Sequence, residues 1–316
     1  MNNIEQMNPM MCDPETGICE IPTASASGNN VNTSAKQHKV RVLYFTDPIC
    51  SSCWGIEPQL RKLKLEYGDS FDIEYRMGGL LKGWDTYGGR DVSGPTSVAQ
   101  HWDEAGAYYE MPIDGDLWIE DPLASSYPPS IAFKAAQLQG TEKALLFLRR
   151  IKEMVFLEKK NIAKWKHLEQ AAWETGLDTE KLKNDFEGGA QALFEEDLSL
   201  AKALGVRGFP SMFFTDEHNN RFLVYGSKPY EQYEQALLKL YPSALKKIVD
   251  TSWENIFSHY PTVTTKEFSV LVNKTPEEAV VVLNDLYLQQ KINRYDSKNG
   301  VLWKAYRRLR RSPGDL

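Results

Sequence analysis

The sequence predicts an α/β fold in which a long helical segment interrupts the sheet. An apolar strand at residues 40–45 leads directly into a helix and then into a second strand at residues 71–77. Residues 83–205 show the hydrophobic period of helices and no strand pattern, and strand patterns resume only at residue 206. A helical insertion between two parts of one sheet explains this order better than a separate bundle, because the strands continue after it.

The first helix begins with a Cys-x-x-Cys motif formed by Cys50 and Cys53. The free N–H groups and the dipole at a helix N-terminus favour an anion, so a cysteine there has a lowered pKa and a more reactive thiolate. We predict that Cys50 is the exposed nucleophile and that Cys53 is the more buried, resolving thiol. The alternative is half of a zinc site, which needs two further ligands. The strand–motif–helix context favours redox chemistry.

The elements around this motif follow from local signals. Pro58 lacks a backbone N–H and should kink the first helix. Strand, helix and strand together begin a βαβ unit with parallel strands. Beyond the insertion, residues 206–214 and 221–226 read as a hairpin, and a helix from Pro229 to Leu240 follows it. Pro210 precedes an apolar strand, a position typical of a cis peptide bond in a tight turn. Within the insertion, about five helices are expected, with the clearest runs at 131–138, 145–157, 168–173 and 190–204.

Residues 1–38 are rich in Asn, Ser, Thr and Ala, and they contain too little apolar surface to order themselves. We expect a disordered tail. It contains Cys12 and Cys19, separated by a segment with Pro and Gly that favours a turn and a small closed loop. Three interpretations of these cysteines stay open: thiols without a role, a regulatory disulfide that exchanges with Cys50, and metal capture.

Residues 242–316 are predicted to form a separate unit. Two short helices at 252–259 and 265–272 precede a helix that begins at Thr275 with an N-cap, a proline and two acids. A hairpin and a basic tail end the chain. Helix, helix, helix and hairpin is the order of a winged-helix domain, so residues 242–316 are expected to be winged-helix-like.

A winged helix can bind DNA through its third helix, and contacts to phosphate need Lys or Arg there. Here that helix carries Glu277, Glu278 and Asp285 and no Lys or Arg, whereas the hairpin and the tail are basic. We therefore expect a protein-docking module and no DNA binding.

Composition narrows the class of protein further. The net charge of −6 gives no general reason to expect nucleic-acid binding, and no run approaches the ~20 apolar residues of a membrane span. The first eleven residues lack the basic start and apolar core of a secretory signal. Four cysteines in 316 residues do not make a disulfide scaffold. We expect a cytoplasmic protein without membrane contact.

Several motifs carry a resemblance to known families. They are Asp47-Pro48-Ile49-Cys50-x-x-Cys53-Trp54-Gly55, Gly78-Gly79-Leu80, His101-Trp102 and Gly208-Phe209-Pro210. On these motifs, residues 40–241 resemble the DsbA branch of the thioredoxin superfamily and its cytoplasmic DsbA-like and FrnE-like oxidoreductases. Two stretches are also similar to YjbH-type adaptors, which deliver the regulator Spx to the ClpXP protease. They are the thiol motif extended to Glu57-Pro58, and Ala132-Phe133-Lys134-Ala135-Ala136-x-Leu138-Gln139-Gly140.

The resemblance implies a thioredoxin fold at residues 39–241, with a DsbA-like helical insertion at about 83–205 and no cofactor. It implies that Cys50 attacks, Cys53 resolves and Pro210 shapes the substrate groove. The substrate-binding candidates are Phe209, which would offer its backbone to an extended peptide, and Trp54, His101, Trp102 and Gly79.

The roles of His101 and Trp102 have an alternative. His101 would then be a surface histidine and Trp102 a tryptophan that only packs in the fold. Position 44 often carries an acid in this family that accepts protons from the buried thiol, but here it is Tyr44. Fast catalysis would then need Glu57 or water for the proton transfer.

Two functional hypotheses follow. The main one is a thiol–disulfide oxidoreductase that uses Cys50 and Cys53 on protein or peptide thiols and disulfides. The alternative is a redox-sensitive adaptor that binds an Spx-like client for ClpXP proteolysis. An isomerase or glutathione transferase of the same fold matches less well, because that branch typically replaces the cysteine with serine.

Overall fold

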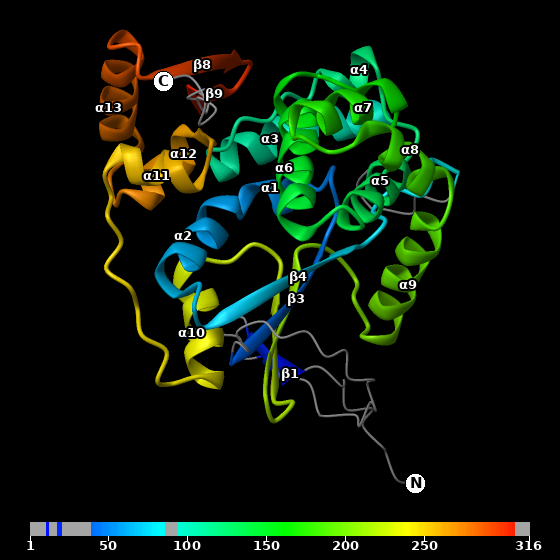
Figure 1. The fold of residues 1–316 in the computed structure, drawn as a ribbon, viewed down its shortest axis with the longest axis horizontal. Coiled ribbons are helices and arrows are strands. Elements are labelled where there is room, and N and C mark those ends of the chain that lie inside the picture. The colour runs from blue at the N-terminus through cyan, green and yellow to red at the C-terminus, as the bar shows by residue number, and fades with distance from the viewer. Residues whose placement is uncertain (1–10, 13–17, 21–38, 86–93, 307–316) are drawn as a thin grey trace, which may run out of the picture.

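The computed structural model describes residues 11–12, 18–20, 39–85 and 94–306, whose strands form two sheets (Figure 1). The larger sheet has six strands in the order β1-β2-β6-β5-β3-β4. These strands are β1 (Met11–Cys12), β2 (Ile18–Glu20), β3 (Val40–Thr46), β4 (Phe71–Met77), β5 (Ser211–Asp216) and β6 (Arg221–Tyr225). The smaller sheet has the order β7-β9-β8 and comprises β7 (Thr262–Thr264), β8 (Ile292–Ser297) and β9 (Gly300–Ala305).

The predicted βαβ unit is present. Strand β3 pairs in parallel with β4 and antiparallel with β5. Helices α1 (Ser51–Gly55) and α2 (Glu57–Tyr67) connect β3 to β4. The kink expected at Pro58 is a break at Ile56, because Pro58 lies in the first turn of α2, where a missing N–H costs no helical hydrogen bond. The predicted hairpin of β5 and β6 is also found, followed by α10 (Tyr230–Leu240).

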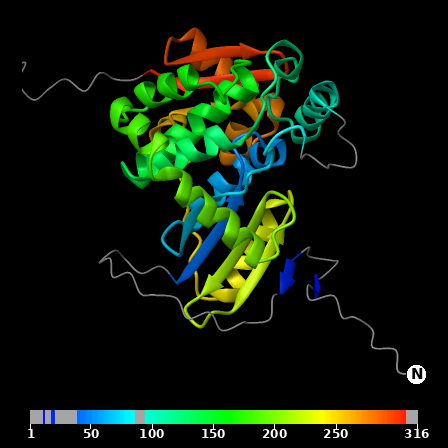
Figure 2. The same ribbon diagram turned by 90° about the vertical axis from the view of Figure 1, so that its right-hand side faces the viewer.

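The insertion contains seven helices within the described residues, two more than expected. They are α3 (Pro95–Tyr109), α4 (Leu117–Glu120), α5 (Tyr127–Gln137), α6 (Thr141–Leu157), α7 (Trp165–Glu174), α8 (Thr179–Glu187) and α9 (Ala190–Ala203). The four predicted runs correspond to α5, α6, α7 and α9. Both views place this helical layer at the end of the larger sheet where α1 begins (Figures 1 and 2). Its core includes Phe147, Ile151 and Phe156 of α6, all fully buried.

The prediction of a disordered tail is wrong for two short segments. Strands β1 and β2 pair with each other, and β2 continues the sheet along β6. An unpaired strand edge offers backbone donors and acceptors to any chain, whatever its side chains, so composition does not reveal this pairing. The backbone register places Cys12 opposite Cys19. The other residues up to position 38 lie outside the described part.

The C-terminal unit comprises α11 (Trp253–His259), β7, α12 (Thr265–Leu271), α13 (Pro276–Leu288) and the hairpin of β8 and β9. This is the predicted order with one addition, since β7 pairs with β9 and completes a three-stranded sheet. Helix α13 begins with a capping box in which Thr275 and Glu278 bond each other's backbone N–H groups. The basic tail beyond residue 306 lies outside the described residues, and the winged-helix assignment stays a prediction.

This unit packs closely on the rest of the chain. Leu302 of β9 belongs to the same apolar core as Trp54 and Trp102. The Asn299 side chain donates to the Ile113 carbonyl at 2.7 Å, and Arg61 of α2 donates to the Thr262 carbonyl at 2.7 Å. Among the described helices, none is both long and apolar enough to cross a membrane.

Candidate thiol site

Cys50 and Cys53 lie where β3 gives way to α1, as the sequence predicts. Cys50 is the N-cap residue of α1, and its Sγ accepts a hydrogen bond from the Cys53 backbone N–H at 3.3 Å. Cys50 is 6% exposed and Cys53 is fully buried. The relative order of exposure agrees with the prediction, although neither thiol is freely accessible.

The proline loop faces this motif. The Phe209–Pro210 peptide bond is cis, and the Cys50 thiol donates to the Phe209 carbonyl oxygen at 3.8 Å. A Cβ atom on Gly78 would lie 1.9 Å from the Phe209 ring, so glycine is needed there for the ring to pack. The structure therefore brings together three predicted site residues, Cys50, Phe209 and Pro210.

A cavity of about 190 Å³ opens beside Cys50. Its wall includes Phe209, Trp84, His101, Trp102 and Trp118, and the described residues that line it include no Lys, Arg, Asp or Glu. His101 is exposed at the cavity. Trp102 is buried and packs edge-on against Trp118, with ring centroids 5.3 Å apart. An uncharged aromatic wall of this size fits one large apolar side chain.

Two other predicted substrate contacts do not reach this cavity, and we correct them. Trp54 is fully buried, because its Nε1 donates to the Pro112 carbonyl at 3.1 Å and the Arg149 guanidinium covers its ring at 4.3 Å. Gly79 has φ of +67°, and a Cβ there would lie 2.9 Å from the Leu198 side chain. Both residues support the fold of the site, and neither lines the cavity beside Cys50.

Asp47 organises the backbone around the thiols, a role that the motif alone did not indicate. Its carboxylate accepts hydrogen bonds from the N–H groups of Ile49 and Leu80 and from the Ser126 hydroxyl, at 2.8–3.1 Å. It thereby ties the Cys50 loop to the chain after β4 and to the start of α5. Burial raises the pKa of Asp47 to about 6, despite these hydrogen bonds.

A buried ion pair lies near the resolving thiol. Lys152 of α6 is 1% exposed, and its Nζ lies 2.8 Å from Glu57 Oε1. The positive charges of Lys152 and Arg61 lower the pKa of Glu57 although burial opposes this. Glu57, expected as an alternative proton acceptor, is therefore a weak base. Within the described residues, the buried Tyr44 hydroxyl has no hydrogen-bond partner, and burial raises its pKa well above the usual range.

Each thiol influences the pKa of the other. The hydrogen bond with Cys53 and burial raise the pKa of Cys50, which is the reverse of the lowered pKa that its helix N-terminus predicts. Although burial opposes ionisation of Cys53, the hydrogen bond from Cys50 and the charge of Lys152 lower its pKa. Cys50 remains the sulfur that lines the cavity.

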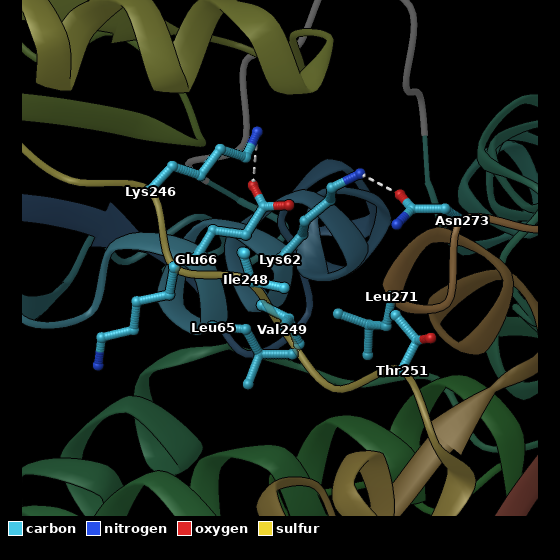
Figure 3. A pocket seen from close by; sticks show the side chains of 10 residues that line it. Lys62, Leu65, Glu66, Lys246, Ile248, Val249, Thr251, Leu271 and Asn273 are labelled. Atoms are coloured by element: carbon cyan, nitrogen blue, oxygen red, sulfur yellow. Dashed lines mark hydrogen bonds and ion pairs between the residues drawn. The ribbon is translucent and has the colours of Figure 1, made fainter.

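The described part of the chain offers no cluster of metal ligands, and its second cavity lies away from the thiols. Across the described ranges, no three His, Cys, Asp or Glu side chains are grouped to hold a metal ion. A larger cavity of about 350 Å³ lies between α2, residues 246–251 and the loop after α12 (Figure 3). Two of its lysines are already bonded, Lys62 to Asn273 at 2.7 Å and Lys246 to Glu66 at 3.1 Å. It contains no thiol, so the candidate site is the one at Cys50.

The fold and the thiol motif define the class of protein. The sequence profile of the family described as Thioredoxin matches residues 43–235, and the chain belongs to this family. It is 33% identical to the ClpXP adapter protein SpxH of Halalkalibacterium halodurans, over 94% of this chain and 97% of the relative. It is 30% identical to the ClpXP adapter protein SpxH of Bacillus subtilis, over 84% of this chain and 89% of that protein.

Solved structures show the same fold. The cytosolic disulfide reductase DsbM of Pseudomonas aeruginosa aligns with a TM-score of 0.51 at 22% identity, over 63% of this chain and 99% of its own. A probable DsbA oxidoreductase of Streptomyces coelicolor aligns with a TM-score of 0.51 at 17% identity, over 67% of this chain and 94% of its own. The resemblance to the DsbA branch and to ClpXP adaptors is confirmed.

Proposed function

We propose that this protein is an adaptor that delivers a client protein to the ClpXP protease. The observation that carries this proposal is the extent of the match. The SpxH relative aligns with 94% of the chain, whereas the oxidoreductase structures align with about two-thirds of it and nearly all of their own length. An architecture that includes the C-terminal unit is therefore shared with the adaptors.

The surface of the C-terminal unit supports protein docking. Helix α13 exposes Val281 and Leu288, seven residues apart on one face, with 70% and 78% of each residue accessible. The exposed Asp285 lies between these two residues on the helix surface, Glu277 lies one turn before Val281, and α13 contains no Lys or Arg. Exposed apolar surface of this kind marks protein–protein contacts, whereas the acidic border disfavours DNA.

A reconstituted degradation assay tests the adaptor proposal. Purified ClpX, ClpP and an Spx-type client are incubated with and without this protein, and client loss is followed over time. We expect the protein to accelerate degradation and to bind the client directly. No acceleration together with no binding, in either redox state of the thiols, would contradict the proposal.

A point variant of α13 tests whether this helix is the docking surface. Leu288→Glu should weaken the contact with client or protease, because it places a charge in the apolar face of α13. Trp173→Glu is the matched control, since Trp173 is 76% exposed on α7, in a different helix. Equal loss of adaptor activity in both variants would argue against a role for α13.

Thiol–disulfide exchange is a second proposed activity, favoured by the geometry of Cys50, Cys53 and the Phe209 carbonyl. In this reaction the Cys50 thiolate attacks a substrate disulfide and releases one substrate thiol. The Cys53 sulfur then displaces the second thiol from the mixed disulfide. The protein dithiol is oxidised, the substrate disulfide is reduced, and the two cysteine protons pass to the substrate sulfurs. We place both activities in the cytoplasm.

Insulin reduction by a dithiol donor tests this second activity. We expect Cys50→Ser to abolish it and Cys53→Ser to accumulate a mixed disulfide that mass spectrometry detects. Undiminished insulin reduction by Cys50→Ser would overturn the assignment of the nucleophile.

A further inference from the structure

A buried chain of charges runs from the thiol pair into the C-terminal unit. It starts at Lys152 of α6, which lies 2.8 Å from Glu57 at the start of α2, directly after the thiol helix α1. The charge of Lys152 also lowers the pKa of Cys53. Arg61 Nε lies 3.9 Å from Glu57 and 3.2 Å from Glu267. Glu267 belongs to α12 of the C-terminal unit and is fully buried.

Glu267 also binds a second arginine. Its two carboxylate oxygens accept hydrogen bonds from Arg149 at 2.7 and 3.0 Å, which is the bidentate geometry of a strong ion pair. Arg149 lies over the ring of Trp54, the residue that follows Cys53. One carboxylate from the C-terminal unit thus neutralises two arginines that flank the thiol helix.

We propose that Glu267 is a positioning residue for the Cys50–Cys53 pair: it holds Arg61 and Arg149, so that Glu57 stays paired with Lys152. The inference rests on the thiol–disulfide exchange proposed above. It assigns to the C-terminal unit an influence on the chemistry of the thioredoxin domain.

The buried network around Glu267 contains the acids Glu57, Glu153 and Glu267 and the bases Arg61, Arg149 and Lys152. Glu153 also lies 3.7 Å from Arg150, which pairs in turn with Glu158 and Glu174. Coulomb interactions between buried groups are screened much less than those at the surface. Neutralising Glu267 removes one negative charge and takes one partner from each arginine. Arg149 keeps Glu153, and both arginines then interact more strongly with Glu57. Glu57 then neutralises less of the positive charge of Lys152, and this charge attracts a thiolate more strongly.

Loss of the Glu267 charge shifts the redox equilibrium toward the dithiol. When Glu57 neutralises less of the Lys152 charge, that charge stabilises a thiolate more strongly. A thiolate occurs only in the reduced form, so the reduced form becomes more stable relative to the disulfide. The other titratable groups near the thiols in the described residues are Asp47, Tyr44, Tyr109 and Tyr233, with His101 in the cavity wall, and they are left unchanged. By linkage, a partner that displaces α12 would change the redox equilibrium, and the redox state would change the binding of that partner.

Equilibration of the full-length protein with glutathione tests the inference. In this reaction two glutathione thiols are oxidised to glutathione disulfide and the Cys50–Cys53 disulfide is reduced to two thiols. Alkylation and mass spectrometry give the reduced fraction. We expect Glu267→Gln to raise the equilibrium constant for reduction by about fivefold or more. Glutamine keeps the side-chain acceptor for the Thr264 N–H, so the cap of α12 survives.

Two further variants separate charge from general loosening. Lys152→Met removes the positive charge near Cys53 and should lower the same constant. Lys298→Gln breaks the exposed contacts of Lys298 with Asp103 and Asp116, which also join the C-terminal hairpin to the insertion. It should leave the constant unchanged.

The outcomes are distinct. A Glu267→Gln constant equal to wild type, or an equal shift in Lys298→Gln, overturns the inference while thiol exchange stands. A wild-type protein that forms no reversible disulfide overturns the exchange activity itself. In that case the pH profile of thiol alkylation still decides the role of Glu267, because Glu267→Gln should move that profile to lower pH.

Discussion

At the scale of single residues, the site depends on groups that hold the thiol loop as well as on the thiols. Asp47 shows this most clearly, since one buried carboxylate accepts three hydrogen bonds from three segments of the chain. The motif placed Asp47 next to the thiols, but its partners Leu80 and Ser126 are far away in sequence. Only the folded chain reveals what the carboxylate does.

Asp47 predicts a pH-dependent contribution to stability. Its pKa is about 6 in the folded state against 3.8 as the reference, so the folded state binds the proton more tightly. The contribution of Asp47 is therefore greatest below the reference pKa and falls as the pH rises through 6, by roughly 3 kcal/mol. The Asp47→Asn variant has no titrating group at this position, so it lacks this pH-dependent contribution to stability.

Chemical denaturation between pH 3.5 and 7 checks this prediction. The free energy of unfolding of Asp47→Asn, minus that of wild type, should increase with pH over this range. A difference that stays constant, or that falls with pH, would contradict a raised pKa of Asp47.

At the scale of elements, local patterns predicted helices well and short strands poorly. Helices α5 and α6 carry apolar residues at helical spacing, and the capping box of α13 is visible in the sequence at Thr275 and Glu278. Strand β7 has only three residues, and β1 and β2 exist through pairing with a distant edge. Segments this short carry no periodic signal.

Helix α13 provides a prediction for an element. Leu283 is fully buried in the core of the C-terminal unit, whereas Val281 on the same helix is 70% exposed. Leu283→Ala should destabilise the protein by about 2–5 kcal/mol through lost packing. Val281→Ala should change stability by less than about 0.5 kcal/mol. Urea unfolding measures both, and similar losses in the two variants would show that the burial is misassigned.

At the scale of the whole molecule, the C-terminal unit and the thioredoxin domain share one interior. Leu302 packs into the insertion core, and Glu267 is surrounded by arginines from α2 and α6. The sequence predicted a separate unit at residues 242–316 because the pattern of elements changes there. Such a change marks a boundary, but it gives no information about the interface between the two units.

This shared interior predicts cooperative unfolding. Separating the units would break the ion pairs of Glu267 with Arg61 and Arg149 and would expose the apolar side chain of Leu302, so the two units stabilise each other. We expect one calorimetric transition for the full chain, and Leu283→Ala should lower its midpoint without splitting it. Two resolved transitions in the wild-type protein would show that the units unfold independently.

The sequence by itself determined the strand, the Cys-x-x-Cys helix, the proline loop and the helical insertion, because each depends on residues within a few positions of one another. Tertiary structure alone decided that Trp54 is buried, that Lys152 meets Glu57 from 95 positions away, and that Glu267 closes the charge network. Ion pairs and burial depend on which surfaces meet after folding, and no local period or propensity records that.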